Sequence, residues 1–217
     1  MTVHWVESPT AGVSYPAAPW HLLGSMWLTV FKVADRVDDL RPAGIYGAAF
    51  VSYDVGSPLT YSELLVARPI STDAVPSAGD RRVSITDIWV DSPASVAGGR
   101  ELWAIPKGLC DFSLESEHRG PLSTTEWTAR LGRTPIASAA FRDVSRAGLR
   151  LPFKLGIWQP GIEDTHGEDR TASLRGSSKA LPARAHWEFN PEGPLGWLDG
   201  ARQLGSLRQA AFRMSFG

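Results

Sequence analysis

Apolar residues gather along this chain in short runs, many of which alternate with polar positions. The 217 residues include 21 glycines and 16 prolines, which separate one run from the next. Runs rich in Val, Ile, Thr, Phe, Tyr and Trp between such breaks are typical of strands joined by turns. The predicted strands cover residues 26–33, 45–53, 61–69, 82–90, 111–117, 124–131, 135–142, 151–158 and 183–189. The pattern therefore predicts a mostly-β fold of the α+β class.

The clearest helical signal begins at Ser92. Ser92 and Pro93 are typical of an N-cap followed by proline at the first helical position, and they predict a helix toward Trp103. Gly98 and Gly99 lie inside this segment, and each glycine costs a helix about 1 kcal/mol. A broken helix or a tight turn is therefore an alternative at this position.

The other helical signals are weaker. Residues 35–40 predict a short helical turn, and residues 195–204 predict a further helix. Residues 161–178 are polar and contain glycine, which favours a loop or a hairpin. No internal repeat or composition shift divides the chain, so we expect residues 1–217 to form a single domain.

The composition narrows the class of protein. With 43% hydrophobic residues the chain can bury a large core, and its nine tryptophans suit a core, a subunit interface or an aromatic pocket. The net charge of −1 favours neither nucleic acid nor an anionic membrane. No apolar run approaches the length of a membrane span. The single cysteine, Cys110, suits a reducing cytoplasm.

Lys107 is the most informative residue for chemistry. The chain has 22 basic residues, of which only four are lysines, and Lys107 lies between Ile105-Pro106 and Gly108-Leu109. Arginine stays charged in proteins, whereas a desolvated lysine can lose its proton and act as a nucleophile. The alternative is a lysine whose aliphatic stem covers apolar surface while its amine stays in water.

Glu63 is the second candidate. On a strand, Tyr61, Glu63, Leu65 and Ala67 share one face, and a carboxylate among such neighbours is costly unless it is paired or protonated. It could serve as a proton carrier or as half of a structural ion pair. Asp87 lies in a similar pattern, and we expect it to be structural.

Other chemistries have little support. The five histidines are scattered without metal-ligand spacing, and no phosphate-binding glycine loop or dinucleotide fingerprint occurs. Cys110 lacks a neighbouring histidine motif and is expected to be a small buried residue. The histidines, the single cysteine and the missing phosphate loop predict no metal and no cofactor. Basic residues are dispersed, so we expect no nucleic-acid partner.

The segment Gly-Arg-Glu-Leu-Trp-Ala-Ile-Pro-Lys, which ends at Lys107, resembles the lysine motif of the acetoacetate decarboxylase-like superfamily. Tyr61-Ser62-Glu63 resembles the glutamate-bearing segment of the same superfamily. The resemblance implies an antiparallel, barrel-like β-domain with a few packed helices, assembled into homo-oligomers. It also implies that Lys107 forms a Schiff base and that Glu63 moves protons. Tyr61 and Trp103, which lie in the two motifs, are candidate substrate-binding residues.

Three positions depart from the family pattern. The second lysine of the decarboxylases corresponds to Gly108, their N-terminal arginine to about Ser25, and their additional glutamate to about Ala48. These small side chains would line a larger and less polar substrate site. Desolvation alone would then lower the pKa of Lys107. We therefore expect little turnover of acetoacetate.

Three functions remain open. The first is a Schiff-base lyase that acts on a bulky apolar ketone or oxo acid by decarboxylation, retro-aldol cleavage or aldol dehydration. The second is a non-covalent cyclase that folds a polyketide-like substrate, with Lys107 as a hydrogen-bond donor. The third is a non-catalytic protein that binds a small carbonyl compound.

Overall fold

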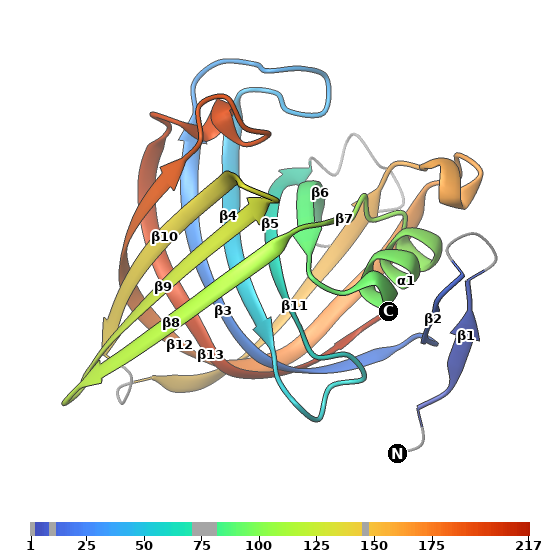
Figure 1. Cartoon of the computed structure of the whole chain (residues 1–217), viewed down its shortest axis with the longest axis horizontal. Coiled ribbons are helices and arrows are strands. Elements are labelled where there is room, and N and C mark those ends of the chain that lie inside the picture. Colours follow the sequence, from blue (N-terminus) through green and yellow to red (C-terminus); the bar gives the residue numbers. More distant parts are fainter. Residues whose placement is uncertain (1–2, 9–11, 71–81, 145–147) are drawn as a thin grey trace.

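The computed structural model describes residues 3–8, 12–70, 82–144 and 148–217 (Figure 1). Strands dominate it, with one α-helix, α1 (Pro93–Trp103), and two 3-10 turns, η2 (Glu163–Thr165) and η3 (Gly196–Leu198), among the described residues. The strands are β1 (Trp5–Glu7), β2 (Ser14–Pro16), β3 (Trp20–Val33), β4 (Gly44–Tyr53), β5 (Tyr61–Ile70), β6 (Arg82–Val90), β7 (Gly108–Leu109), β8 (Asp111–Arg119), β9 (Leu122–Leu131), β10 (Thr134–Val144), β11 (Leu149–Gln159), β12 (Arg170–Phe189) and β13 (Arg202–Phe216).

Every predicted strand is present, and the mostly-β class is confirmed. Seven strands close into a ring in the order β11–β6–β5–β4–β3–β13–β12, because β12 also pairs with β11. All contacts in the ring are antiparallel except the short parallel seam between β11 and β6. The curved sheet in Figure 1 therefore encloses an interior, as a barrel-like domain would.

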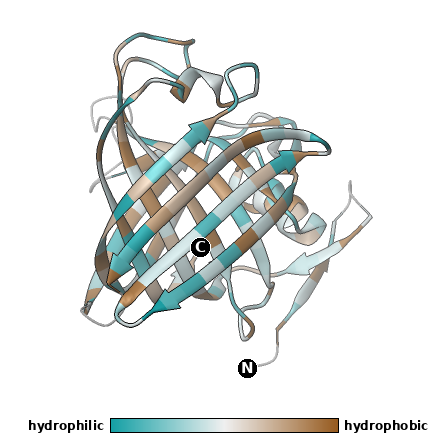
Figure 2. Ribbon diagram, turned by 60° about the vertical axis from the view of Figure 1, so that its left-hand side comes forward, coloured by the Kyte–Doolittle hydropathy of each residue, from teal (hydrophilic) through white to brown (hydrophobic). Residues whose placement is uncertain are grey.

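A second layer extends from the far half of β12. There β12 pairs with β10, and the sheet continues through β9 to β8. This layer folds over the outward faces of β3, β4 and β5 and buries an apolar cluster, which we call the outer core. Its largest members include Trp27, Phe31, Phe50, Leu64, Trp127 and Phe141. Hydrophobic and hydrophilic residues alternate along the strands, as the bands in Figure 2 show.

Strand alternation divides the shared strands between two environments. On β4 and β5, Phe50 and Leu64 face the outer core, whereas their neighbours Ala49 and Glu63 face the interior of the ring. Phe50 stacks on Trp127 with ring centroids 5.2 Å apart. Because both faces of these strands are buried, an error of one residue in register moves a side chain from one environment to the other.

Helix α1 lies at one end of the ring, beside the hairpin of β1 and β2 (Figure 1). Its N-cap is Ser92, whose hydroxyl accepts a hydrogen bond from Ser95 N. The helix runs unbroken through Gly98 and Gly99, so the alternative of a broken helix is wrong. A Cβ atom at Gly98 would lie 2.7 Å from the Trp20 ring. Close packing against this face explains why glycine is kept despite its cost to the helix.

The two weaker helix predictions are wrong. Residues 35–40 form bends without a helical turn. Within residues 195–204 only η3 is helical, and β13 begins at Arg202 because its backbone pairs with β3 and β12. Residues 161–178 belong to the hairpin of β11 and β12, so the hairpin alternative is confirmed. η2 lies in its loop, and the segment from Arg170 onward is part of β12. No helix within the described residues is long and apolar enough to cross a membrane.

Candidate active site

The interior of the ring holds an apolar cavity of about 320 Å³. Cavity-facing side chains come from all seven strands of the ring, from the end of α1 and from the segment that follows it. Among the described residues, the lining side chains with hydroxyl, carboxylate, amine or amide groups are Tyr53, Tyr61, Glu63, Lys107 and Gln209. No arginine is among these lining residues. A ligand in this cavity would therefore meet mostly hydrocarbon, with one polar cluster.

Lys107 lies at the centre of that cluster. The chain leaves α1 through Ala104, which adopts a left-handed conformation, and turns so that the lysine side chain enters the cavity. Lys107 is only 6% exposed. Its Nζ atom lies 2.9 Å from Glu63 Oε2, 2.9 Å from Ser95 Oγ and 3.4 Å from the Tyr61 hydroxyl. The structure thus brings together the two residues that the sequence singled out for chemistry.

Glu63 has a second partner that sequence analysis missed. The Tyr53 hydroxyl donates to Glu63 Oε1 at 3.0 Å, and the Tyr53 and Tyr61 rings stack with centroids 4.3 Å apart. Tyr53 and Tyr61 are cross-strand partners in the hairpin of β4 and β5. The strand pairing could have revealed Tyr53, because directly opposite residues share a face.

Electrostatics in the cluster differ from the expectation for Lys107. Burial opposes its charge, but the Glu63 carboxylate and Tyr61 outweigh burial and raise its pKa above the ordinary value for lysine. The expectation that desolvation alone would set this pKa is therefore wrong, because Glu63 and Tyr61 act against it. Burial, followed by the charge of Glu63, raises the pKa of Tyr53 well above its usual range. Burial also raises the pKa of Tyr61. The resting cluster is a lysine–carboxylate ion pair beside two protonated phenols.

Two of the predicted substrate-binding residues, Tyr61 and Trp103, line the cavity, whereas Ser25 and Ala48 do not. The Ser25 hydroxyl accepts a hydrogen bond from Ala211 N, and Ala48 is fully buried in the outer core. Each lies one residue away from a cavity-facing position on its strand. Neither side chain therefore faces the cavity, whereas Met26 and Ala49 beside them do.

Gly108 is also absent from the cavity lining. It lies on β7 beside Trp89, and a Cβ atom added there would meet the indole ring at 3.2 Å. A side chain at position 108 would therefore point toward Trp89. The conclusion that the cavity is weakly polar still holds, because it depends on the residues that do face inward.

Other charged residues near the motif have structural partners. Arg100 binds Asp164 through two nitrogen atoms, at 2.9 and 2.7 Å. Asp87 forms an ion pair with Arg41 at 2.6 Å, and Glu101 accepts a hydrogen bond from Tyr15. These contacts tie α1 and β6 to neighbouring segments and lie outside the cavity lining.

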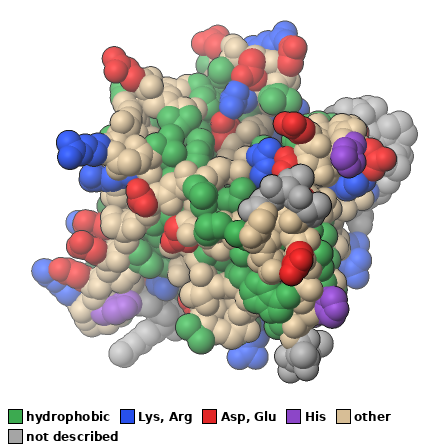
Figure 3. All heavy atoms as spheres, turned by 45° about the vertical axis from the view of Figure 1, so that its right-hand side comes forward, with side chains coloured by type: hydrophobic (Ala, Val, Ile, Leu, Met, Phe, Trp, Pro, Cys, Tyr) green, Lys and Arg blue, Asp and Glu red, His purple; other side chains and the backbone are tan. Residues whose placement is uncertain are grey.

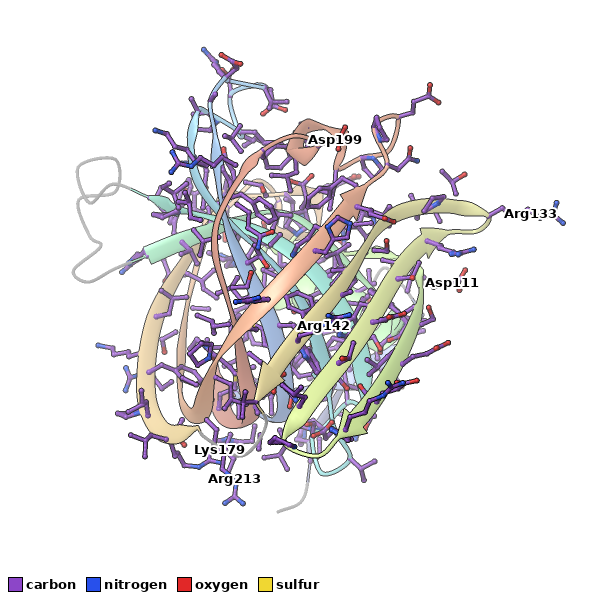
Figure 4. The ribbon with its side chains drawn as sticks, turned by 90° about the vertical axis from the view of Figure 1, so that its left-hand side faces the viewer. Asp111, Arg133, Arg142, Lys179, Asp199 and Arg213 are labelled. Carbon is purple, nitrogen blue, oxygen red and sulfur yellow. The ribbon has the colours of Figure 1, made fainter. Side chains whose placement is uncertain are left out.

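The described residues contain no group of three or more His, Cys, Asp and Glu side chains that could hold a metal ion. Burial raises the pKa of Cys110 to about 12, so this thiol stays protonated. Acidic and basic side chains are interspersed on the face shown in Figure 3. In Figure 4, Arg133, Lys179 and Arg213 project away from the ring. Lys107, by contrast, is buried.

A ring-closed sheet around a buried lysine–carboxylate pair defines a protein with an acetoacetate decarboxylase-like fold. An acetoacetate decarboxylase-like enzyme from Sphingomonas wittichii RW1 aligns with a TM-score of 0.65 and 13% identity, over 92% of this chain and 91% of its own. Acetoacetate decarboxylase from Legionella pneumophila aligns with a TM-score of 0.62 and 15% identity, over 99% and 88% of the two chains. The enduracididine biosynthesis enzyme MppR aligns with a TM-score of 0.60 and 14% identity, over 92% and 85%.

The chain belongs to the acetoacetate decarboxylase (ADC) family, because the model of that family matches residues 11–152. The resemblance inferred from the lysine motif is thereby confirmed. A search of curated protein sequences gave no significant match. The low identities to the solved structures make the chain a divergent member of the superfamily.

Proposed function

We propose that this protein is an enzyme that forms an iminium between Lys107 and a neutral, apolar carbonyl substrate. The observation that carries the proposal is the 2.9 Å contact between Lys107 Nζ and Glu63 Oε2 inside an otherwise apolar cavity. A lysine amine in such a place can attack a carbonyl carbon once it has given up a proton. Glu63 is the nearest group that can take that proton.

The ion pair suits this reaction. Transfer of a proton from Lys107 to Glu63 leaves a neutral amine and a carboxylic acid. The amine attacks the carbonyl carbon, Glu63 returns the proton to the developing alkoxide, and water leaves after a second proton from the nitrogen reaches the hydroxyl group. The product is a protonated iminium beside the Glu63 carboxylate. The net charge of the site is therefore the same before and after, so no unpaired charge is buried.

The next step would be proton transfer at the carbon next to the iminium. Glu63 can accept that proton and leave a neutral enamine, which supports aldol-type bond formation, retro-aldol cleavage or dehydration. Tyr53 would hold Glu63 in place through its 3.0 Å hydrogen bond. Because no arginine is among the described cavity residues, we favour these reactions over decarboxylation of an anionic substrate. Low activity on acetoacetate remains a prediction.

A structural neighbour supports the preference for aldol-type reactions over decarboxylation. MppR has been solved in complex with the condensation product of pyruvate and imidazole 4-carboxaldehyde, and it aligns to this chain with a TM-score of 0.55 and 14% identity. In that protein the same fold holds the product of a carbonyl condensation. This makes aldol-type chemistry a reasonable expectation for a related cavity.

Reductive trapping tests the proposal. We expect borohydride in the presence of heptan-2-one to add the mass of the reduced ketone to Lys107, detectable by peptide mass spectrometry. The variant Lys107→Met should give no adduct. The exposed Lys179, which projects from the ring in Figure 4, supplies the control Lys179→Met, which should still be trapped. Absence of an adduct on the wild-type protein with ketones of any length, or equal trapping of Lys107→Met, would contradict the proposal.

One observation favours a second function. The raised pKa of Lys107, caused by Glu63 and Tyr61, makes the lysine an ammonium group that can donate a hydrogen bond to a carbonyl oxygen without covalent chemistry. A non-covalent cyclase that orders a polyketide-like chain would use it in this way. Turnover that continues without any trapped adduct would identify this function.

A further inference from the structure

The cavity-facing residues of β3, β4 and β5 form rows of directly paired residues across the three strands, and we call each row a rung. On β4, Gly47 is paired with Val30 on one side and Ala67 on the other. Two residues along β4, Ala49 is paired with Leu28 and Leu65. Successive rungs lie about 6.6 Å apart, because each residue of a strand advances the chain by about 3.3 Å.

The third rung carries the chemistry. Val51 on β4 is paired with Met26 and with Glu63. The stacked pair of Tyr53 and Tyr61 lies one rung further on. The polar cluster therefore occupies one end of the rung series, and Gln209, which is paired with Met26, is the remaining polar lining residue in the described part of the chain.

Among the described residues, the opposite end of the cavity is apolar and its lining is exposed. Ile45 lines the cavity and is 40% exposed, and Pro69 lines it and is exposed as well. At the Lys107 end, by contrast, the lining residues Trp103 and Phe216 are 5% and 8% exposed. Pro69 lies six positions after Glu63 on β5, which corresponds to about 20 Å along the strand. The cavity is thus a blind channel with its reactive groups near the closed end.

The middle of the channel has small side chains on its wall. Gly47 and its partner Ala67 share one rung and Ala49 lies in the next, beside larger residues such as Ile85, which is paired with Ala67 on β6. A cavity volume of about 320 Å³ over a length of about 20 Å corresponds to a narrow channel. Such a channel fits one extended chain better than a compact ring system. Its hydrocarbon lining supplies no partners for polar groups in the middle of that chain.

We propose that the substrate is a linear aliphatic carbonyl compound, with its carbonyl at Lys107 and its alkyl chain extended past Ala49 and Ala67 toward Ile45. The position of the carbonyl depends on the function proposed above, whereas the position of the chain depends on the channel alone. The two can therefore fail separately.

Binding of methyl ketones of increasing length tests the inference, with tryptophan fluorescence as the readout. We expect affinity to rise from butanone through heptan-2-one to undecan-2-one by up to roughly fourfold per methylene, the fold-change that about 0.8 kcal/mol of buried apolar surface produces. The bicyclic ketone 2-decalone should bind more weakly than the linear decan-2-one. Equal affinities along the series, or tighter binding of the bicyclic ketone, would overturn the inference.

A variant that blocks the channel tests the path of the alkyl chain. In Ala67→Phe the new ring would fill the rung of Gly47, so undecan-2-one should bind no tighter than butanone, while butanone should bind as in the wild type. Ala67→Leu is the milder variant and should remove part of the chain-length dependence. If undecan-2-one keeps its wild-type affinity in folded Ala67→Phe or Ala67→Leu, the chain does not follow this path.

The variant Lys107→Met separates the two proposals. Chain-length dependence that persists in this variant supports the channel whatever the chemistry. A chain-length dependence in the wild type without any borohydride adduct would keep the linear ligand and remove the Schiff base. An adduct whose yield is the same for butanone and undecan-2-one would keep the Schiff base and overturn the linear substrate.

Discussion

At the scale of single residues, the protonation of Lys107 is set by two opposed effects. Burial favours the neutral amine, and the Glu63 carboxylate at 2.9 Å favours the ammonium ion. The carboxylate and its neighbours prevail, so the folded-state pKa of Lys107 lies above its unfolded value. Removing one partner of such a buried pair typically costs about 3–5 kcal/mol, because the other charge is left uncompensated.

We predict that Glu63→Gln moves the pKa of Lys107 below its ordinary value, since burial then acts without an opposing charge. In the wild type the contribution of the pair to the free energy of unfolding is fully present below the unfolded pKa of about 10.4 and falls as pH rises through the folded pKa. In Glu63→Gln the sign reverses, and stability rises with pH up to about 10.4. Urea unfolding of both proteins between neutral and alkaline pH measures this difference.

The exposed Glu188, on β12, supplies the control for that experiment. Glu188→Gln should keep the pH dependence of the wild type, because the Lys107–Glu63 pair and the other groups that titrate at alkaline pH are the same in both proteins. Parallel pH profiles for Glu63→Gln and the wild type would show that Glu63 does not control the protonation of Lys107.

At the scale of elements, α1 shows how a residue that weakens a helix can serve the site. A Cβ atom at Gly99 would lie 2.8 Å from Lys107 Cδ and 2.9 Å from Cε. The lysine stem therefore lies in the space that a side chain would take. The sequence indicated only that Gly99 destabilises the helix. It could not indicate the contact with Lys107, because Lys107 lies eight residues further along the chain and beyond the end of α1.

We predict that Gly99→Ala slows borohydride trapping of Lys107 by roughly tenfold, which corresponds to about 1.4 kcal/mol. Alanine favours the helix by about 1 kcal/mol, so the helix itself should form, but the methyl group would push the lysine stem away from Glu63. Gly205→Ala is the control, since a Cβ atom there meets nothing within 4 Å. Trapping of Gly99→Ala at the wild-type rate would mean that the lysine stem moves without cost.

Some strands and strand faces could be predicted from the sequence, and others could not. Alternation located β5 and placed Tyr61 and Glu63 on one face, because a period of two is visible in the sequence itself. It could not decide which face of β4 meets the cavity, because Ala48 and Ala49 are both buried, in different environments. β13 was missed because pairing with β3 and β12, and not local propensity, makes residues 202–216 extended.

At the scale of the whole molecule, the cavity exists because the sheet closes on itself between β11 and β6. Their backbone pairing covers only two registered pairs, Gly156 with Arg82 and Ile157 with Val83. Beyond them the side chain of Gln159 continues the seam. Its Oε1 atom accepts from Ile85 N at 2.6 Å, and its Nε2 atom donates to Ile85 O at 3.0 Å. A side-chain amide thus replaces a backbone peptide at the closure of the ring.

We predict that Gln159→Leu lowers the free energy of unfolding by about 2–6 kcal/mol, because a buried backbone donor and a buried acceptor at Ile85 each lose a partner at about 1–3 kcal/mol. Gln159 is 1% exposed, so water cannot replace its amide without opening the seam. Urea unfolding measures the loss, and the Ile85 amide should exchange its hydrogen faster. Gln203→Leu, at an exposed glutamine of β13, should change stability by about 0.5 kcal/mol or less. If Gln159→Leu is as stable as Gln203→Leu and still binds undecan-2-one with wild-type affinity, the two backbone-paired positions between β11 and β6 are enough to hold the ring closed.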